Sequence, residues 1–335
     1  MTHANVQHFL DVMARRYQIR PEDRFSQTFD QTFDPSIFDV FLAWNGGACV
    51  FAMQPLDLIA PTRFVAHHGL TVWFSVPSLP ALMRKKGTLA SGAFPTLRWN
   101  LFCGEPLPCK TAEAWQAAAP HSTVENLYGP TELTITCFAY SWEPQSSPQL
   151  CRPNEGLTAL IVDEQLNPVP FGADGELLVA GPQTAPGYWF DDKRTAERFV
   201  TLPYNEVPGL RFYRTGDRVR KLPGGDYAFL GRADHQIKVL GHRVELGEIE
   251  AVLCRNEGVT QAVALGWPMA EGTAEGVVAF VCGGDVDTHR ILMRAREKLP
   301  DYMAPRQICA LDEMPLNANG KTDRKALLDR LTRMS

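Results

Sequence analysis

The chain has 335 residues, of which 45% are hydrophobic and 21% are charged. These values exclude intrinsic disorder as the default, and the length exceeds that of one ordinary compact domain. The formal net charge of −5 excludes an overall basic footprint, so we expect neither nucleic acid nor a membrane surface as a partner.

In chain order, apolar and β-branched runs predict strands at residues 27–33, 71–76, 97–102, 158–162 and 176–179. Pro77 ends the second run, and Ser78 is placed to cap a short helix. A further helix is expected near residues 111–119. The alternation predicts an α/β domain whose loops gather at strand ends, where open sheets bind ligands.

A second unit is predicted to begin near Asp234. Its expected elements are two helices at residues 246–255 and 288–299 and two strands at residues 259–266 and 277–281. About 100 residues suffice for a small α+β domain. We therefore expect a large domain at residues 1–233 and a small one at residues 234–335.

The cysteines indicate the compartment. All eight are scattered without a Cys-x-x-Cys pair, and residues 1–5 are polar, unlike a signal peptide. This pattern favours a cytoplasmic protein whose thiols are mostly small buried hydrophobes.

Short motifs in a fixed order carry most of the information. They are Phe33-Asp34-Pro35-Ser36, Asn126-Leu127-Tyr128-Gly129-Pro130-Thr131-Glu132, Gly175-Glu176-Leu177, Tyr213-Arg214-Thr215-Gly216-Asp217, Gly231-Arg232-Ala233-Asp234 with Gly247-Glu248-Ile249-Glu250, and Asn319-Gly320-Lys321. Together they resemble the adenylation domains of nonribosomal peptide synthetases, in the adenylate-forming superfamily that also holds acyl-CoA synthetases and luciferase. The resemblance implies a truncated large domain followed by a small mobile domain that rotates about Asp234.

The residues around Tyr128 suit ATP-dependent activation of a carboxylic acid. An aromatic ring can lie against adenine, a Gly-Pro turn lets backbone approach phosphate, and Glu132 offers a hard oxygen ligand for Mg²⁺. The resemblance assigns these roles to Tyr128, Gly129 and Glu132 and places Thr131 near the phosphates. An ordinary turn followed by a helix start is the structural alternative.

Asp217 follows a glycine turn, and a carboxylate can accept hydrogen bonds from both ribose hydroxyls. Similar proteins use this Asp for that purpose and Arg232 for nucleotide contacts; we also expect Gly104 and Glu105 beside the nucleotide. By itself, Thr-Gly-Asp is a common hairpin turn.

Lys321 can bring an ammonium to the negative charge that develops between carboxylate and α-phosphate. The resemblance makes it the main catalytic residue of adenylation. It also implies that domain rotation presents Lys238 and Gly241 for thioester formation, with Gly241 letting a pantetheine arm pass close to backbone. A hairpin turn at Gly241 is compatible with that role.

Asp34 is expected to pair with the α-ammonium of an amino acid, as in amino-acid-activating relatives. The alternative is a helix N-cap, because Pro35 could occupy the first helical position. The other expected pocket residues are mostly bulky and apolar: Pro35, Phe38, Phe74, Leu101, Cys103, Leu127, Ile135 and Thr136. They favour a small uncharged substrate such as alanine, with proline or another compact apolar acid as alternatives.

One family feature is missing from the sequence. Relatives carry a phosphate loop ending in Gly-x-Pro-Lys-Gly, and residues 2–6 resemble the segment directly after it. The sequence leaves open a fragment, a misassigned start, one half of a split enzyme or a decayed relative. We expect impaired activity in this chain alone, a further N-terminal segment that supplies the loop, and a carrier protein acting in trans.

The leading hypothesis is amino acid adenylation with ATP and Mg²⁺. A noncatalytic binding or regulatory module is the first alternative, favoured by the missing loop and opposed by retention of Asp217, Glu132 and Lys321. An acyl-CoA ligase is the second. The substrate's stereochemistry, the carrier and the oligomeric state are left open.

Overall fold

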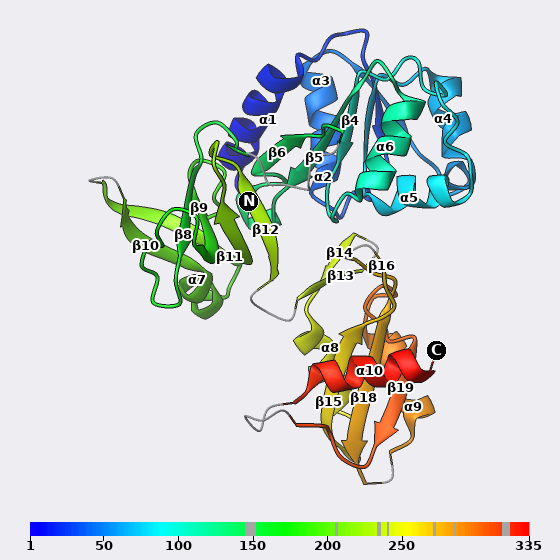
Figure 1. The fold of residues 1–335 in the computed structure, drawn as a ribbon, viewed down its shortest axis with the longest axis vertical. Coiled ribbons are helices and arrows are strands. Elements are labelled where there is room, and N and C mark those ends of the chain that lie inside the picture. Colours follow the sequence, from blue (N-terminus) through cyan, green and yellow to red (C-terminus); the bar gives the residue numbers. More distant parts are fainter. Residues whose placement is uncertain are drawn as a thin grey trace. The chain divides into compact units, whose positions relative to one another are not determined.

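The computed structural model describes residues 1–144, 152–204, 207–232, 236–239, 241–270, 273–284, 286–316 and 322–334. The chain divides into two compact units, Met1–Asp234 and His235–Ser335, which we call unit 1 and unit 2 (Figure 1). Helices and sheets are mixed in both, so the predicted α/β class is confirmed. The hinge predicted at Asp234 lies outside the described residues and stays a prediction.

A seven-stranded sheet with the order β2-β1-β3-β4-β5-β6-β7 forms the first half of unit 1. The strands are β1 (Arg24–Gln27), β2 (Cys49–Ala52), β3 (Val72–Ser75), β4 (Trp99–Phe102), β5 (Thr123–Tyr128), β6 (Phe138–Ser141) and β7 (Arg152–Pro153). Neighbours from β2 through β5 are parallel, whereas β6 and β7 are antiparallel. The loops that follow β3, β4 and β5 therefore leave the same edge of the sheet.

Helices cover both faces of this sheet (Figure 1). They are α1 (His3–Tyr17), α2 (Pro35–Ile37), η1 (Phe38–Leu42), α3 (Ala43–Asn45), η2 (Asp57–Ile59), α4 (Pro61–His68), α5 (Ser78–Lys85) and α6 (Cys109–Ala118). Successive strand residues point to opposite faces. Phe74 thus packs in the core with α1 and η1, while Trp73 packs in the core with α4, α5 and α6.

The second half of unit 1 is an antiparallel sheet of order β10-β11-β9-β8, with β12 paired to β11. Its elements are β8 (Thr158–Val162), β9 (Asp174–Ala180), α7 (Asp192–Arg198), β10 (Phe199–Tyr204), β11 (Val207–Lys221) and β12 (Tyr227–Arg232). Leu177 and Tyr213 of this sheet share a core cluster with Leu133 and Phe138 from the first half. That shared core brings the loop after β5 to the second sheet.

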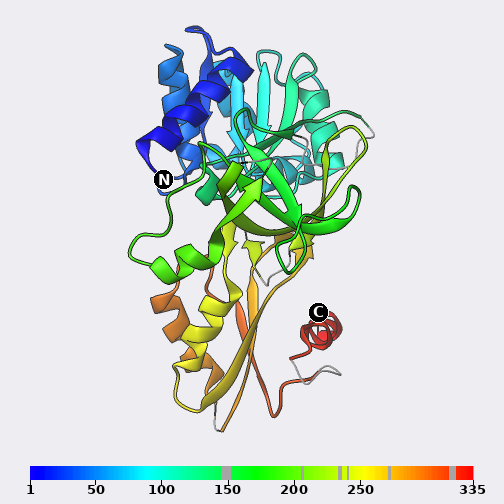
Figure 2. The ribbon, with the colours of Figure 1, turned by 90° about the vertical axis from the view of Figure 1, so that its left-hand side faces the viewer.

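Unit 2 is built on the three-stranded sheet β15-β18-β19. The strands of unit 2 as a whole are β13 (Ile237–Val239), β14 (His242–Val244), β15 (Val259–Gly266), β16 (Met269–Ala270), β17 (Thr273–Ala274), β18 (Val277–Gly283) and β19 (Gln307–Leu311). Its helices are α8 (Leu246–Cys254), α9 (Thr288–Lys298) and α10 (Arg324–Met334). Figure 2 shows α8 and α9 on one face of this sheet and α10 on the other. Alternating residues along β18 serve the two cores: Ala279 faces α8 and α9, and Phe280 faces α10.

Two local predictions are wrong. The strand expected over residues 27–33 ends at Gln27, because a turn closes between Asp30 and Phe33, whose N–H donates to the Asp30 carbonyl at 2.9 Å. Ser78 does not cap α5 but is its first residue. Its own N–H donates instead to the Glu105 carboxylate at 2.8 Å, so an acceptor distant in sequence satisfies this helix end.

Candidate functional site

The loop after β5 runs from Gly129 to Cys137 and folds back on itself. A Cβ atom on Gly129 would lie 2.5 Å from the Thr136 Cα, so only glycine allows this close approach. The loop contains a short 3₁₀ turn, η3 (Thr131–Leu133), and then two β-branched residues in the left-handed region, Thr134 with φ 60° and Ile135 with φ 70°. Such backbone costs of order 1–3 kcal/mol per residue and persists only where the surroundings impose it.

Gln183 supplies much of that support. Its side chain is fully buried, and its Nε2 donates to the carbonyls of Leu133 at 2.9 Å, Thr134 at 3.3 Å and Thr136 at 2.8 Å. The Thr134 hydroxyl donates back to the Gln183 carbonyl at 2.7 Å, and Asn154 donates to the Thr136 carbonyl at 2.8 Å. Sequence reasoning missed Gln183, because a lone Gln about 50 residues from the loop carries no local signal.

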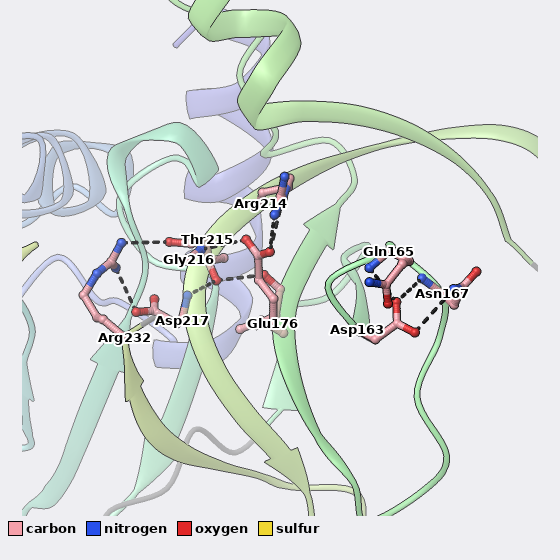
Figure 3. A network of polar contacts seen from close by, with 10 residues as sticks. Asp163, Gln165, Asn167, Glu176, Arg214, Thr215, Gly216, Asp217 and Arg232 are labelled. Atoms are coloured by element: carbon pink, nitrogen blue, oxygen red, sulfur yellow. Dashed lines mark hydrogen bonds and ion pairs between the residues drawn. The ribbon is translucent and has the colours of Figure 1, made fainter. Parts of the chain in front are cut away.

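Asp217 lies in a bonded set with Tyr128 and Arg232. The Tyr128 hydroxyl donates to one Asp217 carboxylate oxygen. Arg232 Nη1 pairs with the other at 2.8 Å, as Figure 3 shows. Burial and the adjacent Asp217 carboxylate hold the pKa of Tyr128 well above its ordinary value, so the phenol remains a donor. The structure thus brings together three residues predicted to contact the nucleotide.

Glu132 is half-buried and accepts a hydrogen bond from the Tyr188 hydroxyl at 2.6 Å. The phenol is neutral, so it orients the carboxylate without cancelling its charge. Burial, and then the Glu132 carboxylate, raise the pKa of Tyr188. The Ala185 N–H donates to the Glu132 carbonyl at 2.9 Å, so segment 183–188 bonds both the backbone and the side chain of Glu132. Sequence reasoning assigned no role to Tyr188. Glu132 lies in the loop that begins directly after Tyr128, and Tyr128 bonds Asp217. Glu132 and Asp217 therefore lie in the same region of unit 1.

Asp34 occupies the N-cap position of α2 with Pro35 at the first helical position, but its side chain makes no capping bond. The Thr131 side chain and the Ile135 backbone are polar groups close to this carboxyl group. Its Oδ2 is buried and has no hydrogen-bond partner among the residues that the structure describes. Burial raises the pKa of Asp34, and the nearby Glu132 carboxylate raises it further. A cation at Oδ2 would offset the desolvation of this group.

Six of the expected apolar pocket residues belong to one core cluster. They are Phe38, Phe74, Leu101, Cys103, Leu127 and Ile135. Phe38 and Phe74 meet at an angle of 62° with ring centroids 4.8 Å apart. Thr136 is 1% exposed, and Pro35 is also buried. The predicted acyl-pocket residues are thus buried and closely packed, and their contact with a substrate stays a prediction.

Gly104 and Glu105 lie in the loop after β4. Gly104 has φ 97°, a left-handed backbone that favours glycine. Glu105 is 6% exposed and accepts the Ser78 N–H. Their predicted contact with the nucleotide remains a prediction; the bond to Ser78 gives Glu105 a structural role as well.

In unit 2, Lys238 lies in β13 opposite Arg243 of β14, and Gly241, with φ 85°, turns the chain between these strands. The expected hairpin is therefore present at Gly241. Lys321, the predicted catalytic lysine, lies outside the described residues, as does Asp234.

Metal ligands and membrane spans can be judged only for the described parts of the chain. No group of three His, Cys, Asp or Glu side chains there is arranged to hold a metal ion, so the predicted Mg²⁺ site depends on Glu132. No described helix combines the length and the apolar character needed to cross a membrane.

Comparison with known proteins identifies the family. The family described as AMP-binding enzyme matches residues 1–189, and the AMP-binding enzyme C-terminal domain matches residues 248–321. Tyrocidine synthase 2 of Brevibacillus parabrevis is 33% identical over 334 residues; the alignment covers 98% of this chain and 9% of that protein.

Two solved structures extend the comparison. The adenylation domain AlmE of Vibrio cholerae, in complex with glycyl-adenosine-5′-phosphate, has a TM-score of 0.89 and 34% identity, covering 99% of this chain and 63% of that one. Holo-PA1221, a nonribosomal peptide synthetase protein with adenylation and PCP domains, has a TM-score of 0.80 and 27% identity, covering 93% and 54%. The chain thus spans less than two thirds of the length of each of these proteins. The TM-scores confirm the predicted adenylate-forming fold. The chain belongs to the AMP-binding enzyme family, as an adenylation domain of the nonribosomal peptide synthetase type.

Proposed function

We propose that this chain activates a small uncharged amino acid with ATP. An oxygen of the amino acid carboxylate attacks the α-phosphorus, the bond to pyrophosphate breaks, and aminoacyl-AMP and pyrophosphate form. The acyl group then passes to the phosphopantetheine thiol of a carrier protein, with AMP as the leaving group. The observation that carries this proposal is the half-buried Asp34, whose buried Oδ2 has no hydrogen-bond partner among the described residues.

Asp34 supports an amino acid rather than a simple carboxylic acid. An α-ammonium would give Oδ2 a charged donor in a site walled by apolar rings, where such a pair interacts strongly. A fatty or aryl acid would leave the buried oxygen without a partner, which is costly.

The packed pocket walls support a small side chain. Phe38 and Phe74 are both 0% exposed and touch each other, and Ile135 and Thr136 come from the rigidly supported loop. The similar AlmE domain was solved with glycyl-adenosine-5′-phosphate. Glycine and alanine are therefore the preferred candidates.

ATP fits the polar part of the site. Asp217 is assigned to the ribose and Tyr128 to adenine. Arg232, Gly104 and Glu105 would lie beside the nucleotide, and Thr131 would lie near the phosphates. Glu132 suits Mg²⁺, because it is a half-buried carboxylate that a neutral phenol orients. When bound, Mg²⁺ would neutralise phosphate charge. Lys321 would stabilise the charge that develops between the reacting groups.

The second step involves unit 2 in this proposal. The hairpin that carries Lys238 and Gly241 would approach the carrier's pantetheine arm after rotation about Asp234. Support comes from holo-PA1221, a similar protein that contains adenylation and PCP domains. The phosphate loop would come from a further polypeptide segment.

Amino-acid-dependent exchange of pyrophosphate into ATP tests the proposal. The assay uses glycine, alanine, proline and phenylalanine, with the chain alone and with a polypeptide that supplies the phosphate loop. We expect exchange with glycine or alanine in the supplemented reaction. No exchange with any of them would contradict adenylation, whereas CoA thioester formation from an acid without an amino group would show an acyl-CoA ligase.

Asp34→Asn should raise the KM for the amino acid by about 10²-fold, because it removes a charged hydrogen-bond partner of the ammonium. The matched control is Asp30→Asn, which alters an exposed carboxyl that accepts hydrogen bonds from Thr32. Equal KM values for the two variants would contradict the assignment of Asp34.

Calorimetry with a nonhydrolysable aminoacyl-AMP mimic separates adenylation from a pure interaction module, which would show no saturable heat.

A further inference from the structure

Strand β11 contains an irregularity where it passes β9. Arg214 pairs with Leu178, and the next paired residues are Arg218 and Glu176. The step is therefore four residues on β11 and two residues on β9. The additional residues form a bulge at Thr215, Gly216 and Asp217, and bulges commonly redirect a side chain next to a functional site.

Glu176 holds one side of this bulge. Its Oε1 accepts the Gly216 N–H at 3.2 Å, and its Oε2 accepts Arg214 Nε at 3.2 Å and Nη2 at 2.6 Å (Figure 3). The Glu176 side chain is 13% exposed, which strengthens these charge-assisted bonds relative to a surface pair. Gly216 has φ 73°, so the carboxylate secures a residue whose backbone is intrinsically permissive.

The opposite side of the bulge carries Asp217. The Thr215 hydroxyl donates to the Leu177 carbonyl at 2.7 Å and accepts the Asp217 N–H at 3.0 Å. Arg232 donates to the Thr215 carbonyl at 3.2 Å and to Asp217 Oδ1 at 2.8 Å (Figure 3). Glu176 and Arg232 thus clamp the bulge from its two sides, and of the two it is Arg232 that bonds the Asp217 side chain.

We propose that Glu176 is a positioning residue for nucleotide recognition. Through Arg214 and Gly216 it keeps the bulge in the shape that aims the Asp217 carboxylate at the ribose hydroxyls. This inference rests on the proposed nucleotide site. In this role Glu176 does not touch the nucleotide. It restricts the conformations available to Asp217, which lowers the conformational entropy lost when the nucleotide binds.

Strand β9 offers a matched comparison. Asp174 is two residues from Glu176 and pairs with Arg220 at 2.5 Å, with exposed fractions of 32% and 48% for the two side chains. Among the described residues, no hydrogen bond joins the carboxylate of this pair to the bulge. Removing Asp174 therefore removes an Arg–carboxylate pair of the same strands without altering the support of Asp217.

The test is discrimination between ribose forms. Calorimetry would compare AMP with 2′-deoxy-AMP and 3′-deoxy-AMP for the full chain with the loop-supplying polypeptide. The unsubstituted chain should prefer AMP by about 10- to 100-fold, the value expected for losing a hydrogen bond to a charged group. Glu176→Met, of similar length, should reduce this preference to about threefold or less, whereas Asp174→Asn should keep it. Adding Asp217→Asn to Glu176→Met should reduce the preference for AMP little further, because both changes disable the same interaction between Asp217 and the ribose.

The outcomes separate two failures. Full ribose preference in Glu176→Met would overturn the positioning role and leave the proposed function intact. Absence of saturable AMP binding by the unsubstituted chain would overturn the nucleotide site itself and this inference with it. Because Glu176→Met could fold poorly, Arg214→Met provides a second measurement: it removes the partner that holds Glu176 and should also weaken the preference, by at least about threefold on the same scale. An unchanged preference in a folded Arg214→Met chain would count against the role.

Discussion

Single carboxyl groups in unit 1 have different tasks because their surroundings differ. Asp39 is 0% exposed in the π-helical segment η1, and neither of its oxygens has a hydrogen-bond partner among the described side chains. Burial raises its pKa well above the ordinary value, an effect that the nearby Thr28 backbone only partly offsets. Asp217, in contrast, is bonded on both oxygens. Burial in this core therefore favours the neutral form of Asp39.

The raised pKa of Asp39 predicts a pH-dependent stability. Above the unfolded-state pKa, near 3.8, the folded chain keeps a proton that the unfolded chain has released, so the free energy of unfolding falls as pH rises. The slope is at most about 1.4 kcal/mol per pH unit for one proton. Asp39→Asn removes this dependence, so its stability relative to the unsubstituted chain should increase as the pH rises above about 4.

Urea unfolding at several pH values measures this difference. Asp11→Asn, on the exposed face of α1, is the control and should run parallel to the unsubstituted chain. A parallel profile for Asp39→Asn as well would show that Asp39 is ionised alike in both states.

Tyr188 is predicted to orient the carboxylate proposed for Mg²⁺. Tyr188→Phe removes the hydroxyl that donates to Glu132 and keeps the ring that packs on Phe199. Partners of a metal ligand typically contribute 10- to 100-fold in affinity, so Mn²⁺ binding in the presence of ATP should weaken by roughly tenfold. Electron paramagnetic resonance of Mn²⁺ measures this without relying on activity. Tyr227→Phe, in the same core cluster, should leave Mn²⁺ binding unchanged; equal behaviour of the two variants would refute the role.

At the scale of elements, the loop after β5 depends on the segment that follows β9. Three carbonyls of the loop have the Gln183 amide as a donor, and Asn5 of α1 in turn donates to the carbonyls of Pro182 at 2.6 Å and Thr184 at 3.2 Å. The loop's left-handed residues are thus held by a buried polar network rather than by a regular ladder. Such networks are costly to break, because the remaining groups stay desolvated.

Gln183→Met should lower the free energy of unfolding by at least about 2 kcal/mol, because buried carbonyls lose their donor while the volume is nearly kept. It should also relax the preference for small amino acids, since Ile135 and Thr136 lie in the same loop. Chemical unfolding and pyrophosphate exchange with a series of amino acids measure the two effects. The control is Gln165→Met on an exposed turn, which should change neither. Loss of stability without any change in selectivity would restrict Gln183 to a structural role.

At the scale of the molecule, each unit has its own core. In unit 2, α8 and α9 pack on one face of the sheet and α10 on the other, with Ile249 and Leu327 among the buried contacts. Asp217 and Glu132 belong to unit 1, whereas Lys238 and Lys321 belong to unit 2. The proposed chemistry therefore requires one arrangement of the two units for Lys321 and another for Lys238, and the convergence of Lys321 with the two carboxylates stays a prediction.

The sequence alone was sufficient for the elements that have a strong local pattern. The strands predicted at residues 158–162 and 259–266 coincide with β8 and β15, because apolar runs bounded by turn residues pair in one way. The motifs also located Tyr128, Asp217 and Arg232, which the structure brings together. Where local signals were misleading, the outcome had two causes: a local turn between Asp30 and Phe33 ends the strand expected at residues 27–33, and the distant Glu105 carboxylate accepts the Ser78 N–H.

Only the tertiary structure revealed the contacts that support the site, including those of Glu176, which the Gly175-Glu176-Leu177 motif marks without assigning it a role. Glu176 lies 40 residues from Gly216, Tyr188 lies 56 from Glu132, and Gln183 lies 49 from Thr134. Motif order marks the groups suited to touch a ligand, since those residue types are set by chemistry. Their supports depend instead on which side chains the packed sheets bring within hydrogen-bond distance, and that depends on the three-dimensional path of the chain.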